Sequence, residues 1–233
     1  MKSPVVFCVI MGVSTFLGGC SAPQFQTLTI LDTPNRVVAL QAIPGAYRGQ
    51  GYDHPVSITK ETMIRIMQGV RIERRGLYSS SSSFGSQSHP AFSESEIQFF
   101  APLIVQGLSQ ATPEELVSFF ETAEIETGEM ESDFQLTTSG GFYVAGGNLH
   151  VFLSNFSVKT PLWQDNEYYE ASFRSRPLEQ MEPQPGRLLY ESGEMMVTAP
   201  DGEIGSTVKG KPWQMAIPLK AFLETQEHVS EKK

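Results

Sequence analysis

Cys20 is the residue whose chemistry is most clearly indicated by the residues around it. It directly follows Leu17–Gly19, which closes an apolar stretch that begins near Val5. Lys2 supplies a positive charge ahead of that stretch, which is too short to cross a bilayer core of about 30 Å as a helix. Small residues beside a cleavage point allow an extended backbone to enter a peptidase cleft. The pattern therefore predicts an export signal that is cut immediately before Cys20.

The run Leu17-Gly18-Gly19-Cys20 resembles the lipobox of bacterial lipoprotein precursors, in which an aliphatic residue and two small residues precede a cysteine. The resemblance implies that residues 1–19 are a signal peptide. It also implies that Cys20 is the lipid attachment site, with a thioether-linked diacylglycerol and an amide-linked acyl chain. Because two or more chains hold a protein firmly to a bilayer, we expect the membrane itself to be the partner of Cys20. The alternative is an ordinary signal peptide and a soluble mature protein.

The residue after the cysteine sets the expected location. In the sorting rule that accompanies the resemblance, aspartate at this position retains a lipoprotein at the inner membrane, and this chain has Ser21. We therefore expect an outer-membrane protein that faces the periplasm in a Gram-negative source. In a Gram-positive source the expected place is the outer face of the cytoplasmic membrane.

Composition limits the classes of protein that remain. Of the two cysteines, Cys8 leaves with the signal and Cys20 takes lipid, so the mature chain has no internal disulfide. Stability must then come from a hydrophobic core, which a single domain of about 200 residues can build. The formal net charge of −9 argues against nucleic acid as a partner, since such binding needs clustered Lys and Arg.

The chain divides into a tether, a domain and a tail. We expect the lipidated cysteine and tether at 20–27, a single globular domain at 28–224 and a polar tail at 225–233. Inside the domain, 76–90 holds the serine run Ser79 to Ser83 and predicts a flexible surface loop. Such a loop is either a tolerated insertion or a functional lid.

Helical periodicity marks two early segments. The first is an apolar stripe behind Thr59 as helix cap, made of Met63, Ile66, Met67 and Val70. The second starts at the capping box of Ser93 and Glu96 and continues on one apolar face to Leu108. Pro102 lies inside it and predicts a kink or a break.

A third helix is predicted from Thr112-Pro113-Glu114-Glu115, which is typical of a helix start. The apolar residues that follow at helical spacing are Leu116, Phe119, Phe120 and Ala123. Because the connection to the previous helix is short, we expect an antiparallel helix pair. The acidic residues up to Glu131 are interpreted as a solvated face rather than a metal site.

Strand patterns account for the rest of the domain. A hairpin is predicted from 28–31 and 36–40, and later strands from 134–138, 142–145, 149–158, 187–190, 195–199 and 213–217. Gly140-Gly141 and Gly146-Gly147 are interpreted as the turns that join the middle strands. The fold class is therefore α+β, with an antiparallel β-sheet packed against two or three amphipathic helices.

Residues able to perform other chemistry are scattered. No nucleotide-binding, zinc-protease or nucleophile-elbow motif occurs, so we expect no cofactor, no metal and no catalytic set. A hydrolase would need several of Asp53, His54, His150, Glu167 and Glu170 to converge in one pocket. The basic residues Arg71, Arg74 and Arg75 are read as local charge neutralisers, with lipid phosphate contact as the alternative. Arg174 and Arg176 are read as exposed strand charges, with a carboxylate site as the alternative.

These observations favour a non-catalytic accessory, assembly or binding component of the cell envelope. A short tether, a firm anchor and the lack of a recognisable catalytic motif support that reading. Envelope proteins are then the expected further partners. Two alternatives stay open: an anchored hydrolase with an unrecognised acid and histidine site, and a carrier of an apolar ligand between the helices and the sheet.

Overall fold

The structure is a computed structural model, and it describes residues 25–42, 51–74, 87–125, 134–161, 173–184, 186–191 and 213–220. The predicted lipobox and Cys20 lie outside these ranges, as do Glu167, Glu170 and the predicted strand at 195–199.

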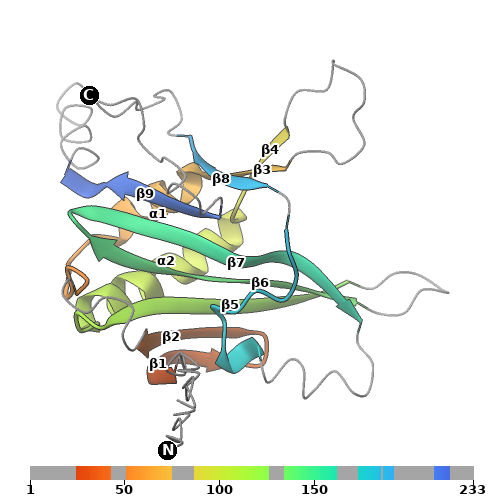
Figure 1. The fold of residues 1–233 in the computed structure, drawn as a ribbon, viewed down its shortest axis with the longest axis horizontal. Helices are drawn as coiled ribbons and strands as arrows, with labels where there is room; N and C mark the ends of the chain where they lie inside the picture. Colours follow the sequence, from red (N-terminus) through yellow and green to blue (C-terminus); the bar gives the residue numbers. More distant parts are fainter. Residues whose placement is uncertain are drawn as a thin grey trace, which may run out of the picture.

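A six-stranded antiparallel sheet dominates the described residues (Figure 1). Its strand order is β1-β2-β5-β6-β7-β9. The strands are β1 (Phe25–Thr33), β2 (Arg36–Ala42), β5 (Glu115–Ile125), β6 (Phe134–Ala145), β7 (Asn148–Pro161) and β9 (Gln214–Pro218). The predictions of a first hairpin and of a closing strand near Trp213 are confirmed, because β1 pairs with β2 and β9 pairs with β7.

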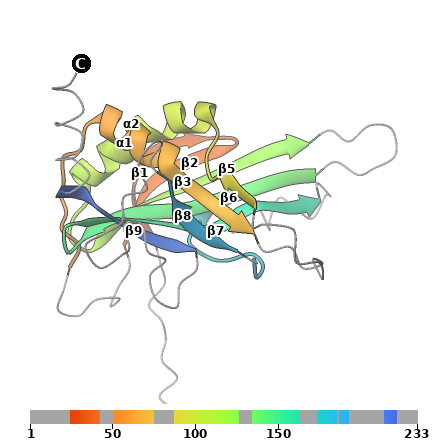
Figure 2. The same cartoon turned by 90° about the horizontal axis from the view of Figure 1, so that it is seen from above.

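Two helices and a small second sheet complete the described architecture. The helices are α1 (Lys60–Gly69) and α2 (Glu94–Gln110), and the small sheet has the order β4 (Gln87–Pro90), β3 (Val70–Arg74) and β8 (Arg187–Tyr190). Both helices lie on the same side of the large sheet (Figure 2). The predicted α+β class with an antiparallel sheet is therefore confirmed at this level, with strands outweighing helices.

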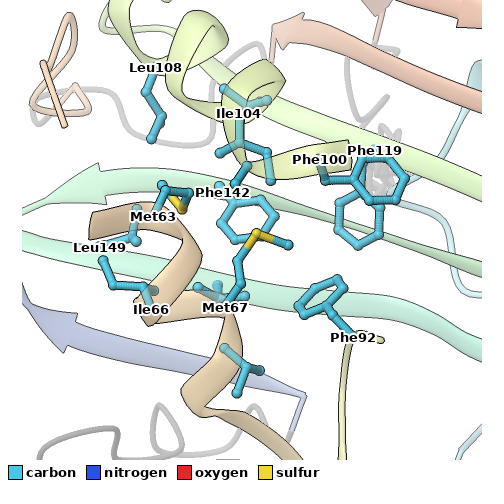
Figure 3. Packing of buried hydrophobic residues seen from close by; sticks show 14 of the residues in the cluster. Met63, Ile66, Met67, Phe92, Phe100, Ile104, Leu108, Phe119, Phe142 and Leu149 are labelled. Atoms are coloured by element: carbon cyan, nitrogen blue, oxygen red, sulfur yellow. The ribbon is translucent and has the colours of Figure 1, made fainter. Parts of the chain in front are cut away.

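The main hydrophobic core fills the space between these helices and the sheet (Figure 3). Its largest fully buried side chains come from both layers and include Met63, Ile66, Met67, Phe100, Ile104, Leu108, Phe119 and Phe142. The predicted apolar stripe of α2 faces this core through Ile97, Phe100 and Ile104. A ligand carried between helices and sheet would have to occupy the space that these side chains fill.

The segment Leu116 to Ala123 is a strand, so the predicted third helix and the antiparallel helix pair are wrong. The helix-start signal does form local bonds, because the Thr112 amide donates to a Glu115 carboxylate oxygen at 2.8 Å. The chain then extends as β5 between β2 and β6. Phe119 is buried on the helix side of β5 and Phe120 on the opposite side, so both faces are covered. In a strand that is buried on both faces, apolar and polar residues do not alternate cleanly. The apolar residues of this segment therefore fit the spacing of a helix by chance.

Gly140 and Gly141 are not a turn, because β6 runs through them without interruption. They pair with Phe119 and Ser118 on one side and with β7 on the other. A Cβ on Gly140 would lie 2.1 Å from the Phe152 carbonyl oxygen, so glycine is needed here for close backbone approach. The predicted turn at Gly146-Gly147 is confirmed, and both of these glycines have positive φ values.

Both predicted N-caps are confirmed, and α2 does not break at Pro102. Thr59 caps α1, and Ser93 and Glu96 form the complete capping box of α2. Pro102 has no amide to donate to the Gln98 carbonyl, but Gln98 lies on the exposed face, where water can satisfy that oxygen. Packing of the buried face holds the remaining turns together.

Two further boundaries differ from prediction. Val70 begins β3 instead of ending the helical stripe, and its backbone conformation is extended. Gln87–Pro90, the end of the predicted serine-rich loop, is strand β4 and pairs with β3. In both cases strand pairing decides the local structure: Val70 of β3 pairs with Tyr190 of β8, and β4 pairs with β3.

The face of the large sheet opposite the helices is partly covered by residues 173–184, which we name the strap. Phe173 packs against Val37, Ala39 and Phe120 at one end, and Leu178 packs near Tyr143 further along. The strap runs from beside β1 and β2 across the sheet towards β8 (Figure 1).

Candidate functional site

The edge strand β1 is the described element closest in sequence to the predicted lipid attachment site. Only Ser21 to Gln24 separate Cys20 from Phe25, where β1 begins. We define Phe25 and Leu28 as the β1 apolar edge, because these large hydrophobic side chains are 52% and 46% exposed. Phe25 was placed in the tether by sequence, because the strand was expected to start three residues later.

Irregular pairing brings the two side chains of the β1 apolar edge to one face. Phe25 pairs with Ala42 and Leu28 with Leu40, and a register shift lies between them. Ala42 and Leu40 are alternate residues of β2, so their partners share a face although they are three residues apart. Leu40 belongs to the main core, which identifies that face as the helix-bearing one.

Polar contacts fix β1 to its neighbours. Thr27 donates to the Glu115 carboxylate and, at 3.4 Å, to the Leu40 carbonyl oxygen. At the other end, Arg174 of the strap binds Asp32 and donates to the Pro34 carbonyl oxygen at 2.7 Å. Partial burial acts to raise the pKa of Glu115, but hydrogen bonds from the Thr27 hydroxyl and from Thr112 outweigh it and lower that pKa. The edge strand is therefore held in place while its apolar side chains stay exposed.

His54, a candidate for hydrolase chemistry, is committed to the backbone. Its Nδ1 lies 2.8 Å from the Glu115 carbonyl oxygen, and its Nε2 accepts from the Val144 amide at 3.0 Å. Nδ1 therefore carries the proton and the ring is neutral. Desolvation by burial lowers the pKa of His54, consistent with that state. The ring bridges two strands, and neither nitrogen is left for a substrate.

The other hydrolase candidates in the described ranges are also engaged in the fold. The Asp53 carboxylate accepts from the Gly147 amide at 3.0 Å, and the His150 ring stacks on Tyr143 with centroids 4.5 Å apart. His150 Nε2 lies 3.3 Å from the Ala145 carbonyl oxygen. Asp53, His54 and His150 thus each bind backbone groups in or near the β6–β7 turn, and these contacts support the fold.

The arginines contact neighbouring groups of the protein. Arg71 donates to the Ser88 carbonyl oxygen at 3.0 Å and lies 3.1 Å from a Glu191 carboxylate oxygen, as expected for a local neutraliser. The Arg74 side chain and Arg75 lie outside the described part. Arg174 sits in a helical turn, not in a strand, and binds at β1, whereas Arg176 pairs with Glu179 at 3.0 Å. The structure does not bring Arg174 and Arg176 to one carboxylate site.

A buried charge cluster lies at the N-terminal end of α2 and was not predicted. Glu121 of β5 is buried and pairs with Arg36 at 2.6 Å, and the Arg36 guanidinium lies 4.3 Å from the centre of the Phe99 ring. Burial and a hydrogen bond with Glu96 raise the pKa of Glu121 to about 7, against the lowering effect of Arg36. No sequence pattern signals this cluster, because it depends on the pairing of β2 with β5.

Metal and membrane-spanning features are lacking within the described ranges. No group of three or more His, Cys, Asp or Glu side chains there is arranged to hold a metal ion. None of the helices there has the length and apolar character needed to cross a bilayer. Among the described residues, the exposure of the two apolar side chains of the β1 apolar edge is thus the feature that packing within the fold does not explain.

Comparisons with protein-family models, with curated proteins and with solved structures give no match for this chain.

Proposed function

We propose that this protein is a membrane-anchored envelope lipoprotein whose folded domain serves as a non-catalytic accessory, assembly or binding component. The single observation that carries the proposal is the sequence Leu17-Gly18-Gly19-Cys20 at the end of a short apolar segment, just ahead of β1. In a Gram-negative source, Ser21 favours the outer membrane and a domain that faces the periplasm.

The short distance between anchor and domain supports a role close to the membrane. An extended chain advances at most about 3.6 Å per residue, so Phe25 lies no more than about 18 Å from Cys20. Lipid chains on Cys20 then keep the start of β1 within a layer about 18 Å deep at the bilayer surface. Any partner must be within reach of a domain held there.

The described part of the chain supports a non-catalytic role more than a catalytic one. His54 uses both ring nitrogens for backbone groups, and Asp53 binds the β6–β7 turn. A general base needs a free position within hydrogen-bond reach of its substrate. The candidate hydrolase residues within the described ranges therefore act in the fold, and we interpret the domain as a surface for binding.

Metabolic labelling tests the anchor directly. The full precursor is expressed in a bacterium fed an alkyne fatty acid, and the Cys20→Ser variant serves as the matched control. We expect the parent to take up label and sediment with membranes, and the variant to lose both properties. Mass spectrometry of the N-terminal peptide should show acylated Cys20 at the start of the mature chain. A mature chain in the aqueous fraction with an unmodified thiol contradicts the proposal.

Cross-linking in intact envelopes tests the accessory role. A photoactivatable residue at exposed positions of the membrane-bound protein should yield reproducible protein, glycan or lipid neighbours. The same residue at a buried core position is the control and should yield none. Envelopes in which the exposed positions give no reproducible neighbour contradict an accessory or binding role.

A further inference from the structure

The β1 apolar edge joins exposed hydrophobic surface to a backbone edge that is poorly suited to strand addition. β1 lies at the end of the large sheet, where one side of its backbone has no neighbouring strand in the described structure. Its pairing with β2 shows register shifts between Gln26 and Leu28 and between Thr29 and Leu31. Bulges of this kind twist an edge away from regular pairing and protect it against added strands. The available contact surface is therefore the side chains of Phe25 and Leu28.

The charge pattern of β1 differs from that of the chain as a whole. The chain has a formal net charge of −9, yet Phe25 to Leu31 contains only apolar, threonine and glutamine side chains. The first charge, Asp32, is bound by Arg174 at the far end of the strand. The strand itself therefore brings no charge to the boundary between lipid headgroups and acyl chains, and the Glu115 carboxylate beside it is held by the Thr27 hydroxyl.

The position of the edge selects lipid as its occupant. Phe25 follows Cys20 after four residues, so lipid chains on Cys20 hold the edge at the bilayer at high local concentration. We propose that Phe25 and Leu28 insert into the lipid interface and fix the orientation of the domain on the membrane, an inference that rests on the proposed anchoring at Cys20. One acyl-linked point leaves a domain free to rotate, and a second apolar contact removes that freedom.

Lipid quenching of tryptophan fluorescence tests the contact. The full lipidated protein is reconstituted into vesicles of phosphatidylethanolamine and phosphatidylglycerol, with or without brominated lipid. Phe25→Trp and Leu28→Trp are compared with the parent, and Gln98→Trp on the exposed face of α2 is the matched control. We expect the emission added at either edge position to fall about twofold with bromine, because interfacial residues lie about 5–10 Å deep. The control should change little.

Flotation of the same vesicles separates the two ideas. A chain that floats but shows no added quenching at the edge positions overturns the lipid contact and leaves the anchor standing. A chain that fails to float overturns the anchor, and the inference with it.

A second measurement identifies the competing occupant. The mature chain contains no cysteine besides Cys20, so Phe25→Cys introduces a unique free thiol once Cys20 is acylated. If this variant forms disulfide-linked dimers on vesicles and the tryptophan variants show no bromine quenching, a second copy covers the edge. That result overturns the lipid contact. Monomers together with quenching support it.

Discussion

His54 shows how a residue type associated with catalysis can be wholly structural. Its ring connects the Glu115 carbonyl oxygen of β5 with the Val144 amide of β6, so it carries a proton at one nitrogen and accepts at the other. A protonated imidazole would have two donors and could no longer accept from that amide. Burial lowers the pKa of His54 for the same physical reason, since it penalises the charged form.

We predict that His54→Ala lowers the free energy of unfolding by about 2–4 kcal/mol, because it leaves two buried backbone groups unpaired and opens a cavity. Urea denaturation measures this change. His89→Ala is the matched control, and since His89 is exposed on β4 its effect should stay within about 0.5 kcal/mol. Equal effects of the two substitutions would contradict a structural role for His54.

Glu121 is the residue through which pH is expected to act on stability. Its pKa of about 7 in the fold exceeds its usual 4.5, because burial and Glu96 oppose the charged form more than Arg36 favours it. A group with a raised pKa contributes its full stability below the unfolded value and loses it as pH rises through the folded value. The contribution of Glu121 therefore falls between about pH 4.5 and pH 7.

Glu121→Gln is predicted to flatten this part of the stability profile. The unfolding free energy of the parent minus that of the variant should fall as pH rises from about 4.5 to 7 and stay constant above about pH 8. Urea midpoints measured across this range give the difference. Glu124→Gln, an exposed change on the same strand, should leave the shape of the profile unaltered. Parallel profiles for the parent and Glu121→Gln would rule out this assignment.

At the scale of elements, β6 depends on the absence of a side chain at Gly140. A Cβ there meets the Phe152 carbonyl oxygen at 2.1 Å and Leu153 Cα at 2.9 Å, so backbone must move to accept it. We predict that Gly140→Ala costs about 3 kcal/mol of unfolding free energy. The control is Gly146→Asn in the β6–β7 turn, where φ is +58° and asparagine is tolerated, so the cost should stay below about 1 kcal/mol. Thermal unfolding compares them, and a tolerated Gly140→Ala would contradict the close approach.

Local signals predicted those elements whose structure is decided locally. The first hairpin, the capped starts of α1 and α2 and the turn at Gly146-Gly147 all follow from caps, periodicity or turn residues. β5 did not, because both of its faces are buried, one in the main core under the helices and the other around Phe120, and this removes the alternation that marks a strand. The double glycine of β6 was misread for a related reason, since its close contact with β7 is a tertiary constraint.

The candidate site divides in the same way. Lipid attachment at Cys20 is predicted from the residues just before it. Those residues lie outside the described ranges, so the structure does not test this prediction. The exposure of Phe25 and Leu28 could not be read from sequence, because it depends on where α2 ends over β1 and on the register shifts of that strand. An apolar residue within a strand is expected to be buried unless that strand is known to lie at the edge of its sheet.

At the scale of the whole molecule, the buried amide of Asn155 makes several of the hydrogen bonds that hold the strap to the sheet. Asn155 of β7 donates to the Ser139 hydroxyl and to the Glu179 carbonyl oxygen, each at 2.8 Å, and accepts from the Met181 amide at 2.8 Å. Arg174 fastens the other end at the β1–β2 turn. The strap therefore connects the β1–β2 turn with β7 across one face of the sheet.

We predict that Asn155→Ala releases the middle of the strap and costs about 2 kcal/mol, because buried partners lose their hydrogen bonds. Hydrogen exchange should rise in 173–184 while α2 keeps its protection. Asn148→Ala, the same substitution at the start of β7, is the control and should leave exchange in the strap unchanged. Unaltered exchange of the strap in Asn155→Ala would show that its other contacts suffice.

The strand order also governs when the sheet can be completed. The neighbours of β5 are β2 from early in the chain and β6 from just after it, and the outer position beside β7 is filled only by Gln214–Pro218. A ribosome delivers the N-terminal hairpin long before these later partners exist, and distant pairings form slowly. Until β5 to β7 have been synthesised, the chain therefore holds only the first hairpin of the large sheet, so a helper that shields nascent strands should raise its yield more than that of a helical protein of equal length.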